Sequence, residues 1–337
     1  MSRPSPPASR PSARCFVDWA EHCSRSEAMA RALNMELVRH HRPNRGLASM
    51  PRKYATQAAL TLLDLWRLRP RAVACMSPSP LTALPVWLYC RATGARFVID
   101  AHTGAFIGPP WERFAAISRF FCGRADLTIV TNRELAGRVE EAGGTALVIP
   151  DVPTEQHPPE PAARAKEPVA VFVSSFAQDE PIDVVIEAAR RCPDVRVKVT
   201  GRPKGPGARV LASAPANVES LGFVSRQTYL AEIANADVVI ALTTRDHTMQ
   251  RGAYEAIYLG TPVIVSDWPL LREHFADGGL VSANEAGALA QCLRRAIEQR
   301  EHLAVSAQRL RERKLARWDD NCKQIERVLD GAAGGAA

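Results

Sequence analysis

Short runs of apolar, often β-branched residues alternate with longer amphipathic stretches along most of this chain. In the first half the runs lie at 15–19, 35–40, 72–77, 96–101, 127–131 and 146–150, and in the second half at 169–175, 196–201, 218–223, 238–244 and 263–267. The stretches with helical periodicity lie at 24–33, 54–68, 82–92 and 133–142, then at 182–191, 227–235 and 252–259, with later helices up to Leu329. Strands that alternate with helices build parallel sheets covered on both faces. We therefore predict an α/β chain with two Rossmann-like, doubly wound domains.

The length of 337 residues suits two domains better than one. Proline and charged residues replace the periodic pattern after position 152, which indicates a linker. The predicted organisation is a disordered tail (1–13), an N-terminal Rossmann-like domain (14–152), a linker (153–168), a C-terminal Rossmann-like domain (169–315), a C-terminal helix (316–330) and a disordered tail (331–337). Open parallel sheets bind ligands at the carboxyl ends of their strands, so we expect the site in a central cleft between the domains.

The composition restricts the possible partners. The net charge of +7 suits anionic small molecules, phosphates or an acidic membrane at least as well as nucleic acid, and no basic stretch interleaved with aromatic residues is present. Eight scattered cysteines without a CxxC pair favour reduced thiols rather than a disulfide framework or a zinc cluster. Asp-x-Asp and HExxH motifs are also missing, so we expect no metal and no cofactor.

The sequence also predicts where the protein resides. Residues 1–13 contain no apolar run of the kind that a signal peptide needs. The longest apolar stretch, Leu81 to Cys90, has about half the length required to cross a bilayer. The segment from Arg39 to Lys53 is rich in cations, and we hypothesise that it contacts an acidic lipid surface or a phosphorylated acceptor, with Leu81–Tyr89 nearby. We expect a cytoplasmic protein that can visit the inner face of the membrane.

The most informative segment reads HTMQRGAYEAIYLGTPVIVSDW and covers residues 247–268. We predict a helix that starts near Thr248 and Met249 and ends at Gly260, where Thr261-Pro262 leads into a strand. The unpaired amides of such a helix start, at residues 248–252, form a seat for a diphosphate. Glu255 lies about two turns further along and can accept hydrogen bonds from the two hydroxyls of a ribose.

This segment resembles the nucleotide-binding motif of GT-B glycosyltransferases, in particular retaining glycosyltransferase family 4 (glycosyl transferases group 1). Glu255 matches the second Glu of the family's pair, and Gly260, Pro262 and Val263 match its strand entry. His247 stands where the family has the first Glu, which faces the donor sugar. The resemblance therefore implies that His247, or Asp246 after a shift of one residue, replaces that Glu as a catalytic residue. The same helix start supplies the implied donor-binding residues, which are Thr248, Met249, Gln250, Arg251, Gly252 and Glu255.

Other segments extend the resemblance over most of 15–330, including 124–151 and 318–322. The resemblance implies that 14–152 is the acceptor domain, that 169–315 is the nucleotide-sugar domain, and that the helix over 316–330 crosses back to the first domain. RFVIDAHTG (96–104) is similar to the strand whose final His reaches the donor sugar, which makes His102 a catalytic candidate. The segment 218–242 resembles the one beside the base, where Phe223 and Val224 would lie. We expect these two side chains in the core rather than stacked on the base, with backbone atoms that can still read it.

Two family features are missing. The Arg and Lys that neutralise the diphosphate are absent from 174–183, and we expect Arg202 and Lys204 to replace them. The glycine-rich first turn is replaced by WAEHCSRSEAM (19–29), where we expect Ser24 and Arg25 to bind the acceptor.

The resulting prediction is a glycosyltransferase that moves a sugar from a nucleotide-diphosphate sugar to a glycan, glycolipid or small-molecule acceptor. Retention at the anomeric carbon is implied by the resemblance, and metal-independent transfer by the missing Asp-x-Asp motif. Two alternatives stay open: a GT-B-type nucleotide-sugar epimerase, and a non-catalytic sugar-nucleotide-binding protein, which the missing Glu and missing Arg-Lys pair favour. The absence of an early G-x-G-x-x-G disfavours a dinucleotide oxidoreductase.

Overall fold

The structure is a computed structural model that describes residues 14–43, 46, 49–77, 79–106, 111–153, 167–246 and 248–331. The predicted tail at 1–13, most of the predicted linker at 153–168, and the tail at 331–337 beyond its first residue lie outside the described residues. The chain divides into two compact units, which we describe separately. The N-terminal unit comprises Met1–Thr154 and Trp318–Ala337, and the C-terminal unit comprises Glu155–Arg317.

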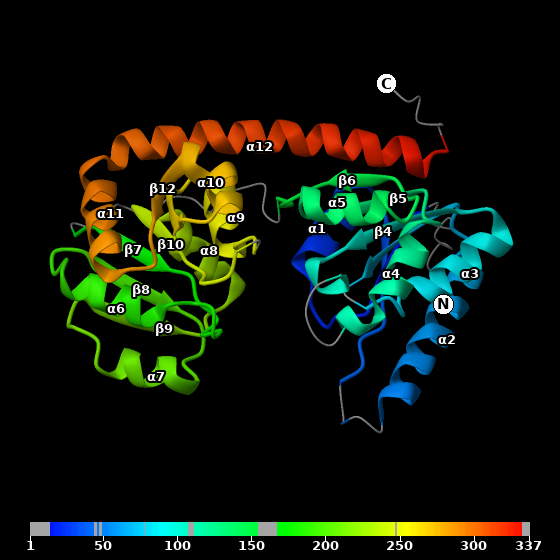
Figure 1. Cartoon of the computed structure of the whole chain (residues 1–337), viewed down its shortest axis with the longest axis horizontal. Helices are drawn as coiled ribbons and strands as arrows, with labels where there is room; N and C mark the ends of the chain where they lie inside the picture. Colours follow the sequence, from blue (N-terminus) through cyan, green and yellow to red (C-terminus); the bar gives the residue numbers. More distant parts are fainter. Residues whose placement is uncertain are drawn as a thin grey trace, which may run out of the picture. The chain divides into compact units, whose positions relative to one another are not determined.

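The N-terminal unit contains a six-stranded parallel sheet in the order β2-β1-β3-β4-β5-β6 (Figure 1). Its strands are β1 (Arg14–Asp18), β2 (Glu36–Arg39), β3 (Ala72–Ser77), β4 (Arg96–Ala101), β5 (Leu127–Val130) and β6 (Ala146–Val148). Each lies within one or two residues of a run predicted from the sequence. The order reverses between β1 and β3, as in doubly wound sheets.

Helices cover both faces of this sheet. They are α1 (Ser24–Ala32), α2 (Met50–Leu68), α3 (Ala83–Thr93), α4 (Ala115–Cys122) and α5 (Arg133–Glu140), with short 3₁₀ turns η2 (Thr103–Ala105) and η3 (Trp111–Phe114) before α4. One face packs against α2, α3, α4 and α5 through buried side chains such as Leu65 and Leu135. The other face packs against α1 and the end of α12 (Arg300–Leu329) through Met29 and Ile325. Helix α4 was not predicted, because a segment of eight residues is too short to show a clear helical periodicity.

The C-terminal unit contains a second six-stranded parallel sheet, in the order β12-β11-β10-β7-β8-β9. Its strands are β7 (Val169–Phe172), β8 (Arg196–Thr200), β9 (Val218–Gly222), β10 (Val238–Ala241), β11 (Val263–Ser266) and β12 (Gly279–Ser282). The sequence predicts only the first five of these. Strand β12 has the four residues Gly-Leu-Val-Ser, which are too few and too mixed to stand out as a run. The fold class itself, two Rossmann-like α/β units, is confirmed.

In the described part of this unit, seven α-helices surround the second sheet. They are α6 (Ile182–Arg190), α7 (Gly205–Ala212), α8 (Arg226–Ala234), α9 (Arg251–Tyr258), α10 (Pro269–Phe275), α11 (Ala286–Glu298) and the first part of α12. Helices α6 and α11 pack on one face of the sheet, and α8, α9, α10 and α12 pack on the other. The predicted helix over 316–330 is the final part of the longer α12. Because all six strands run in one direction, the loops that follow them gather at one edge of the sheet, here called the carboxyl edge.

Candidate functional site

At the carboxyl edge of the C-terminal unit, two glycines allow the chain to pack closely against the residues that follow β7. Gly201 follows β8 with φ of +94°, and a Cβ atom there would lie 2.1 Å from the carbonyl oxygen of Ser174. At the start of α9, a Cβ on Gly252 would lie 2.6 Å from Cγ1 of Val173. Both contacts fix segments against the residues that follow β7. The start of α9 is therefore held directly beside the end of β7, where ligands of such sheets bind.

Helix α9 starts later than predicted. Its first residue is Arg251, and its N-cap residue Gln250 has φ of −89° and ψ of 113°, which is extended backbone. The prediction of a helix start near Thr248 and Met249 is therefore wrong. Thr248 lies in the preceding loop, where its hydroxyl donates to the carbonyl of Asp246 at 3.3 Å, and Met249 packs beside the core. The amides of the first helical turn belong to residues 251–253.

Glu255 lies at the centre of a hydrogen-bonded cluster on this edge. Its Oε1 accepts hydrogen bonds from Nη1 of Arg226 and Nε of Arg251, each at 2.8 Å. Its Oε2 accepts one from the hydroxyl of Tyr229 at 2.7 Å. Glu255 is 2% exposed. The carboxylate predicted to hold a ribose is thus bound by the protein's own side chains in this structure.

Glu255 raises the pKa of two of its neighbours in this cluster. Burial raises the pKa of Tyr229 well above its usual value, and the neighbouring Glu255 raises it further. Burial lowers the pKa of Arg251, but the attraction of Glu255 outweighs that effect and the pKa is raised. Arg226 and Arg251 retain 37% and 52% side-chain exposure, so both guanidinium groups reach solvent. Two cations therefore face one carboxylate in this cluster, each through a charge-assisted hydrogen bond.

An exposed aromatic ring lies further along the same edge. Phe223, directly after β9, is 80% exposed, which contradicts the expectation that its side chain is in the core. The guanidinium of Arg202 lies 5.9 Å from the centre of its ring, within reach of a cation–π contact. Val224 is half-buried, and Lys204 is exposed immediately before α7. The structure therefore brings Arg202 and Phe223 together, a pairing that the sequence did not reveal.

The loop after β7 already holds a negative charge. Oε2 of Glu180 accepts hydrogen bonds from the amides of Ser175 and Ala177 at 2.8 and 3.1 Å, and from the hydroxyl of Ser174 at 2.7 Å. Phe176 within this loop has φ of +57°. Consecutive amides in such a turn form an anion-binding concavity. This is where the family's Arg and Lys are missing, and Glu180 occupies the concavity.

The loop after β10 is anchored at its beginning. The hydroxyl of Thr243 donates to Asp179 at 3.0 Å, and its carbonyl accepts from Nε1 of Trp268 at 2.9 Å. Asp246 is half-buried further along the loop. The other catalytic candidate of this loop, His247, lies outside the described residues.

In the N-terminal unit, Asp100 at the end of β4 joins two of the predicted residues. Its carboxylate accepts hydrogen bonds from Nε and Nη2 of Arg25 at 3.1 and 3.0 Å, and it lies 3.2 Å from Nε2 of His102. Asp100 is 1% exposed, whereas the side chain of His102 is 29% exposed. Arg25 also donates to the carbonyl of Ile149 at 3.1 Å. Ser24 is half-buried at the first position of α1.

The charges around Asp100 define the tautomer of His102. Burial by itself would raise the pKa of Asp100, but Arg25 and His102 lower it well below its usual range. An ionised carboxylate can only accept, so Nε2 of His102 carries the hydrogen and donates it. In the neutral imidazole Nδ1 then remains as an acceptor. Asp100 thus orients His102, a role that the sequence analysis missed although Asp100 precedes it by two positions on the strand.

The C-terminal unit has a recognisable sequence signature. The sequence profile of the family described as "Glycosyl transferases group 1" matches residues 153–313. The match spans slightly less than half of the chain, and we call the C-terminal unit that is similar to this family the group 1 domain. That finding confirms the resemblance drawn from Glu255 and the Gly260-Thr261-Pro262 strand entry.

Curated relatives match little more than a third of the chain. The D-inositol 3-phosphate glycosyltransferases of Mycobacterium sp. (strain KMS) and Mycobacterium bovis (strain BCG / Pasteur 1173P2) are 29% and 30% identical over 133 and 141 residues. These matches cover 36% and 38% of this chain, and 30% and 29% of the relatives' own length. The likeness therefore spans less than a third of each relative.

Solved structures resemble the group 1 domain together with the N-terminal unit. Sucrose-phosphate synthase from Thermosynechococcus elongatus has a TM-score of 0.72 at 16% identity, covering 95% of this chain and 100% of that one. Anabaena HepE in complex with UDP-glucose has a TM-score of 0.67 at 14% identity, covering 93% and 97%. At such identities the likeness shows the fold alone, which is the GT-B fold.

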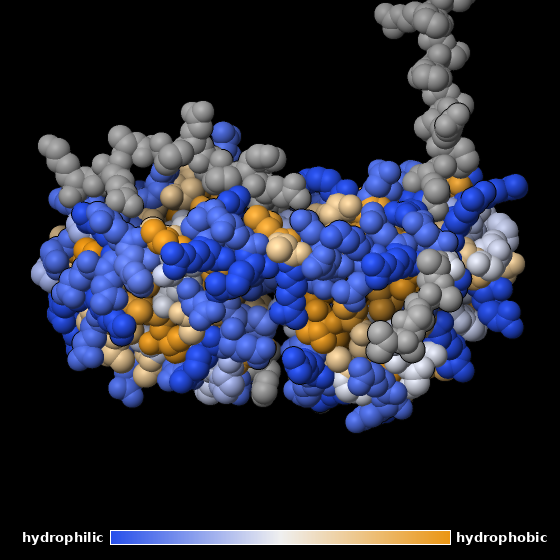
Figure 2. Space-filling view, turned by 90° about the horizontal axis from the view of Figure 1, so that it is seen from above, coloured by the Kyte–Doolittle hydropathy of each residue, from blue (hydrophilic) through white to orange (hydrophobic). Residues whose placement is uncertain are grey.

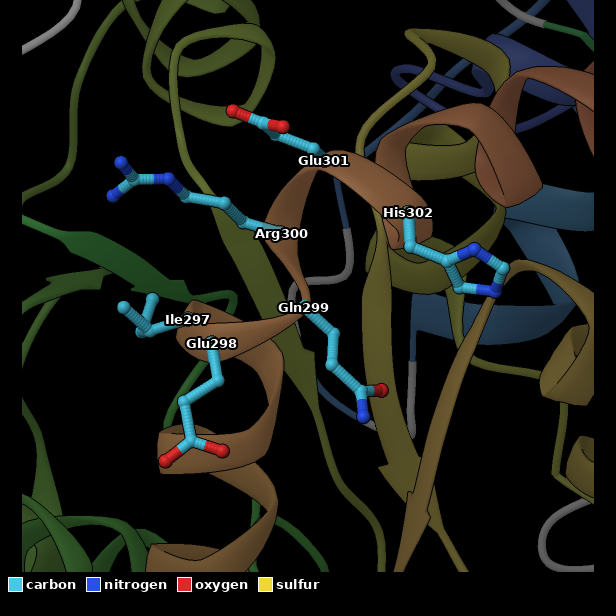
Figure 3. A pocket seen from close by; sticks show the side chains of 6 residues that line it. All are labelled: Ile297, Glu298, Gln299, Arg300, Glu301 and His302. Carbon is cyan, nitrogen blue, oxygen red and sulfur yellow. The ribbon is translucent and has the colours of Figure 1, made fainter.

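The group 1 domain also has a large surface hollow away from this edge. A hollow of about 650 Å³ is lined by Ile297, Glu298, Gln299, Arg300, Glu301 and His302 at the α11–α12 junction (Figure 3). Helix α11 returns from the carboxyl end of β12, so its last turn lies toward the opposite edge of the sheet. The side chains in Figure 3 diverge rather than point toward a common centre. We therefore assign the candidate site to the carboxyl edge.

The described residues also bear on metal binding and on membrane crossing. In the part of the chain that the structure describes, no three His, Cys, Asp or Glu side chains are grouped so as to hold a metal ion. None of the described helices combines the length and apolar character needed to cross a bilayer.

Proposed function

We propose that this chain transfers a glycosyl group from a nucleotide-diphosphate sugar to an acceptor. The observation that carries the proposal is the position of Glu255 in a group 1 domain, on the helix that starts beside the end of β7. Structural neighbours with the same fold are described as complexes with UDP and with UDP-glucose, which supports a nucleotide sugar as the donor. The choice among UDP, GDP, ADP and TDP is left to experiment.

Donor binding in this proposal exchanges partners around Glu255. The carboxylate has about four acceptor positions and uses three of them within the protein. Ribose hydroxyls would replace one or both guanidinium groups, whose side chains are partly exposed. The released Arg226 or Arg251 would then face the diphosphate, together with the first amides of α9, including that of Gly252.

The remaining donor residues are proposed from their places on the same edge. Arg202 and Lys204 add positive charge near the diphosphate, and Phe223 with Val224 flanks the base. Because Glu180 already fills the amide concavity after β7, the positive charge must come from these side chains and from the Glu255 cluster. Thr248, Met249 and Gln250 complete the loop that precedes α9.

For the chemical step we propose His102 as a residue that contacts the donor sugar through its accepting Nδ1 nitrogen. Asp246 or His247 would take the place of the missing first Glu. Retention of configuration is proposed from the family resemblance, and metal-independent transfer from the absence of an Asp-x-Asp motif. Arginine, lysine and helix amides would stabilise the charge of the leaving diphosphate. Activity lost with a chelator and restored by magnesium or manganese would contradict metal independence.

The acceptor is proposed to be a glycan, a glycolipid or a small molecule. Ser24 and Arg25 lie at the carboxyl edge of the N-terminal unit, where Arg25 is already paired with Asp100. We place the reaction in the cytoplasm, at the inner face of an acidic membrane, because cations follow β2 and precede α2. No nucleic acid is expected to take part.

A panel of nucleotide sugars tests the proposal. Thermal-shift measurements should show selective stabilisation by one donor, since a bound ligand stabilises the folded state in proportion to its affinity. Incubation of that donor with candidate acceptors should then release the nucleoside diphosphate, and NMR of the product should show retained configuration. Turnover of the donor without an acceptor would indicate an epimerase instead. Binding without turnover in a broad acceptor screen would indicate a non-catalytic binding protein.

A further inference from the structure

Helices α2 and α3 of the N-terminal unit expose large apolar side chains. Leu63 and Trp66, one turn apart on α2, are 45% and 51% exposed, and Leu84 and Leu88, one turn apart on α3, are 40% and 44% exposed. The two helices pack against each other, and the ring of Trp66 meets that of Tyr89 edge-on at 5.5 Å. The two exposed stripes are therefore neighbours on the outer side of the helical layer.

Helix α4 extends this surface. Phe114, Ile117 and Phe120 follow one another at a spacing of three residues, and each is at least 40% exposed. Helix α3 packs against α4, and the ring of Trp87 lies 5.9 Å from that of Phe120. We call the exposed sides of α2, α3 and α4 the outer helical face. Figure 2 shows that hydrophobic side chains reach the surface of this unit and are bordered by hydrophilic ones.

Basic residues outnumber acidic residues on the helices that carry this apolar surface. From α2 to α4 the helices, together with η3, carry Arg52, Lys53, Arg67, Arg91, Arg113 and Arg119 against Asp64 and Glu112. Asp64 lies 3.0 Å from His40 and 3.7 Å from Arg67, so its charge is partly met within the protein. At the start of α2, Arg42, Arg52 and Lys53 also line a hollow of about 280 Å³.

We propose that the outer helical face binds the surface of an anionic lipid bilayer. This inference rests on the proposed function, because it names the surface through which a glycosyltransferase acting at a membrane would bind that membrane. Exposed Trp, Phe and Leu side chains enter the boundary between headgroups and acyl chains, and the cations of the same helices pair with lipid phosphates. Two copies of the chain are disfavoured as partners, because their like charges would meet. Nucleic acid is also disfavoured, because its phosphate backbone would not bury the exposed leucine side chains.

Co-sedimentation of the full chain with lipid vesicles tests this inference. We expect binding to vesicles of phosphatidylcholine with added phosphatidylglycerol, weak binding to phosphatidylcholine alone, and weakening by added sodium chloride. Each basic residue near an anionic surface contributes about fivefold in affinity, so Arg52→Gln with Lys53→Gln should reduce binding about 30-fold. Leu63→Gln with Leu88→Gln removes two half-exposed leucines and should reduce it roughly tenfold or more.

Matched controls lie in the C-terminal unit. Val305 on α12 is 52% exposed, and Arg209 on α7 is exposed, so Val305→Gln and Arg209→Gln repeat the chemical changes elsewhere. Both should bind vesicles as the unmodified protein does. Equal binding to neutral and anionic vesicles, no binding at all, or equal loss in the controls would overturn the inference. A dimer that forms without lipid and is dispersed by Leu63→Gln with Leu88→Gln would also overturn it, in favour of a second copy.

Donor binding separates this inference from the proposed function. Thermal shifts with nucleotide sugars should be unchanged in the Leu63→Gln, Leu88→Gln protein. If vesicle binding holds while no nucleotide sugar stabilises the protein, the membrane surface stands and glycosyl transfer fails. If a donor binds and is turned over while vesicles are ignored, the transferase stands and the membrane surface fails.

Discussion

Nη1 of Arg226 lies 2.8 Å from Oε1 of Glu255, so the first helical residue after β9 is hydrogen-bonded to the carboxylate of α9. Arg226 follows Phe223 by three positions, and Glu255 follows Arg251 by four. This contact therefore joins the segment proposed to flank the base to the one proposed to hold the ribose and diphosphate. A ligand that forms hydrogen bonds with Arg226 or Glu255 in place of this contact must therefore also change the position of the other side chain.

Replacing Glu255 with Gln should weaken both the fold and donor binding. The substitution keeps the shape but removes the carboxylate charge that Arg226 and Arg251 face, which we expect to cost about 1 to 3 kcal/mol of unfolding free energy. Urea denaturation measures that loss, and thermal shift with the preferred nucleotide sugar measures the loss of affinity. The control is Glu187→Gln, which affects exposed pairs with Arg190 and Arg191 and should cost under about 1 kcal/mol. Unchanged donor affinity in the Glu255→Gln protein would remove Glu255 from the proposed site.

Replacing Tyr229 with Phe should change how stability depends on pH. Because burial and Glu255 raise the pKa of Tyr229 in the fold, its contribution is present below about pH 10 and is lost as pH rises toward the pKa of the folded state. We expect Tyr229→Phe to lose about 1 to 3 kcal/mol at pH 7, from one hydrogen bond to a carboxylate. The variant should also lose less stability than the unmodified protein between pH 9 and 11. If the unfolding free energies of the two proteins fell in parallel over that interval, the loss of stability could not be assigned to Tyr229. Tyr54 and Tyr89, whose pKa values are also raised by burial, contribute equally to both proteins.

Removal of the His102 side chain should affect transfer more than stability. Asp100 keeps its paired contact with Arg25 in His102→Ala, so the unfolding free energy should change by less than about 1 kcal/mol. Loss of one hydrogen bond to the donor sugar should lower kcat/KM roughly 10- to 100-fold. The matched control is His302→Ala on α12, where the side chain is exposed. An unchanged kcat/KM in the His102→Ala protein would contradict the proposed contact of His102 with the donor sugar.

A methyl group added at Gly252 should disturb the start of α9. Its Cβ would lie 2.6 Å from Cγ1 of Val173, and we expect a loss of about 1 to 3 kcal/mol together with weaker donor binding. Gly137 is the control, because it lies in α5 with open space around its Cβ position, and Gly137→Ala should stabilise by about 0.4 to 1 kcal/mol. Combining Gly252→Ala with Val173→Ala should recover part of the loss. A Gly252→Ala protein as stable as the wild type would show that this contact is unimportant.

Local patterns in the sequence predicted much of the fold. Eleven of the strands were found because buried parallel strands are continuous apolar runs, which stand out against the amphipathic helices between them. Helices α4 and α7 and strand β12 escaped, since each has eight or fewer residues and too little periodicity. The two-residue error at the start of α9 has a similar origin, because Thr248 and Met249 carry no signal that excludes a helix.

The sequence by itself determined that this chain forms two α/β units and that Glu255 and His102 follow strands at the edge where such sheets bind ligands. The tertiary structure decided what these side chains touch. Arg226 and Glu255 are 29 positions apart, and Arg25 and Asp100 are 75 apart. Hydrophobic periodicity acts over a few residues and therefore fixes helices and strands, whereas a hydrogen bond or ion pair depends on which distant segments the folded sheet brings within 3 Å.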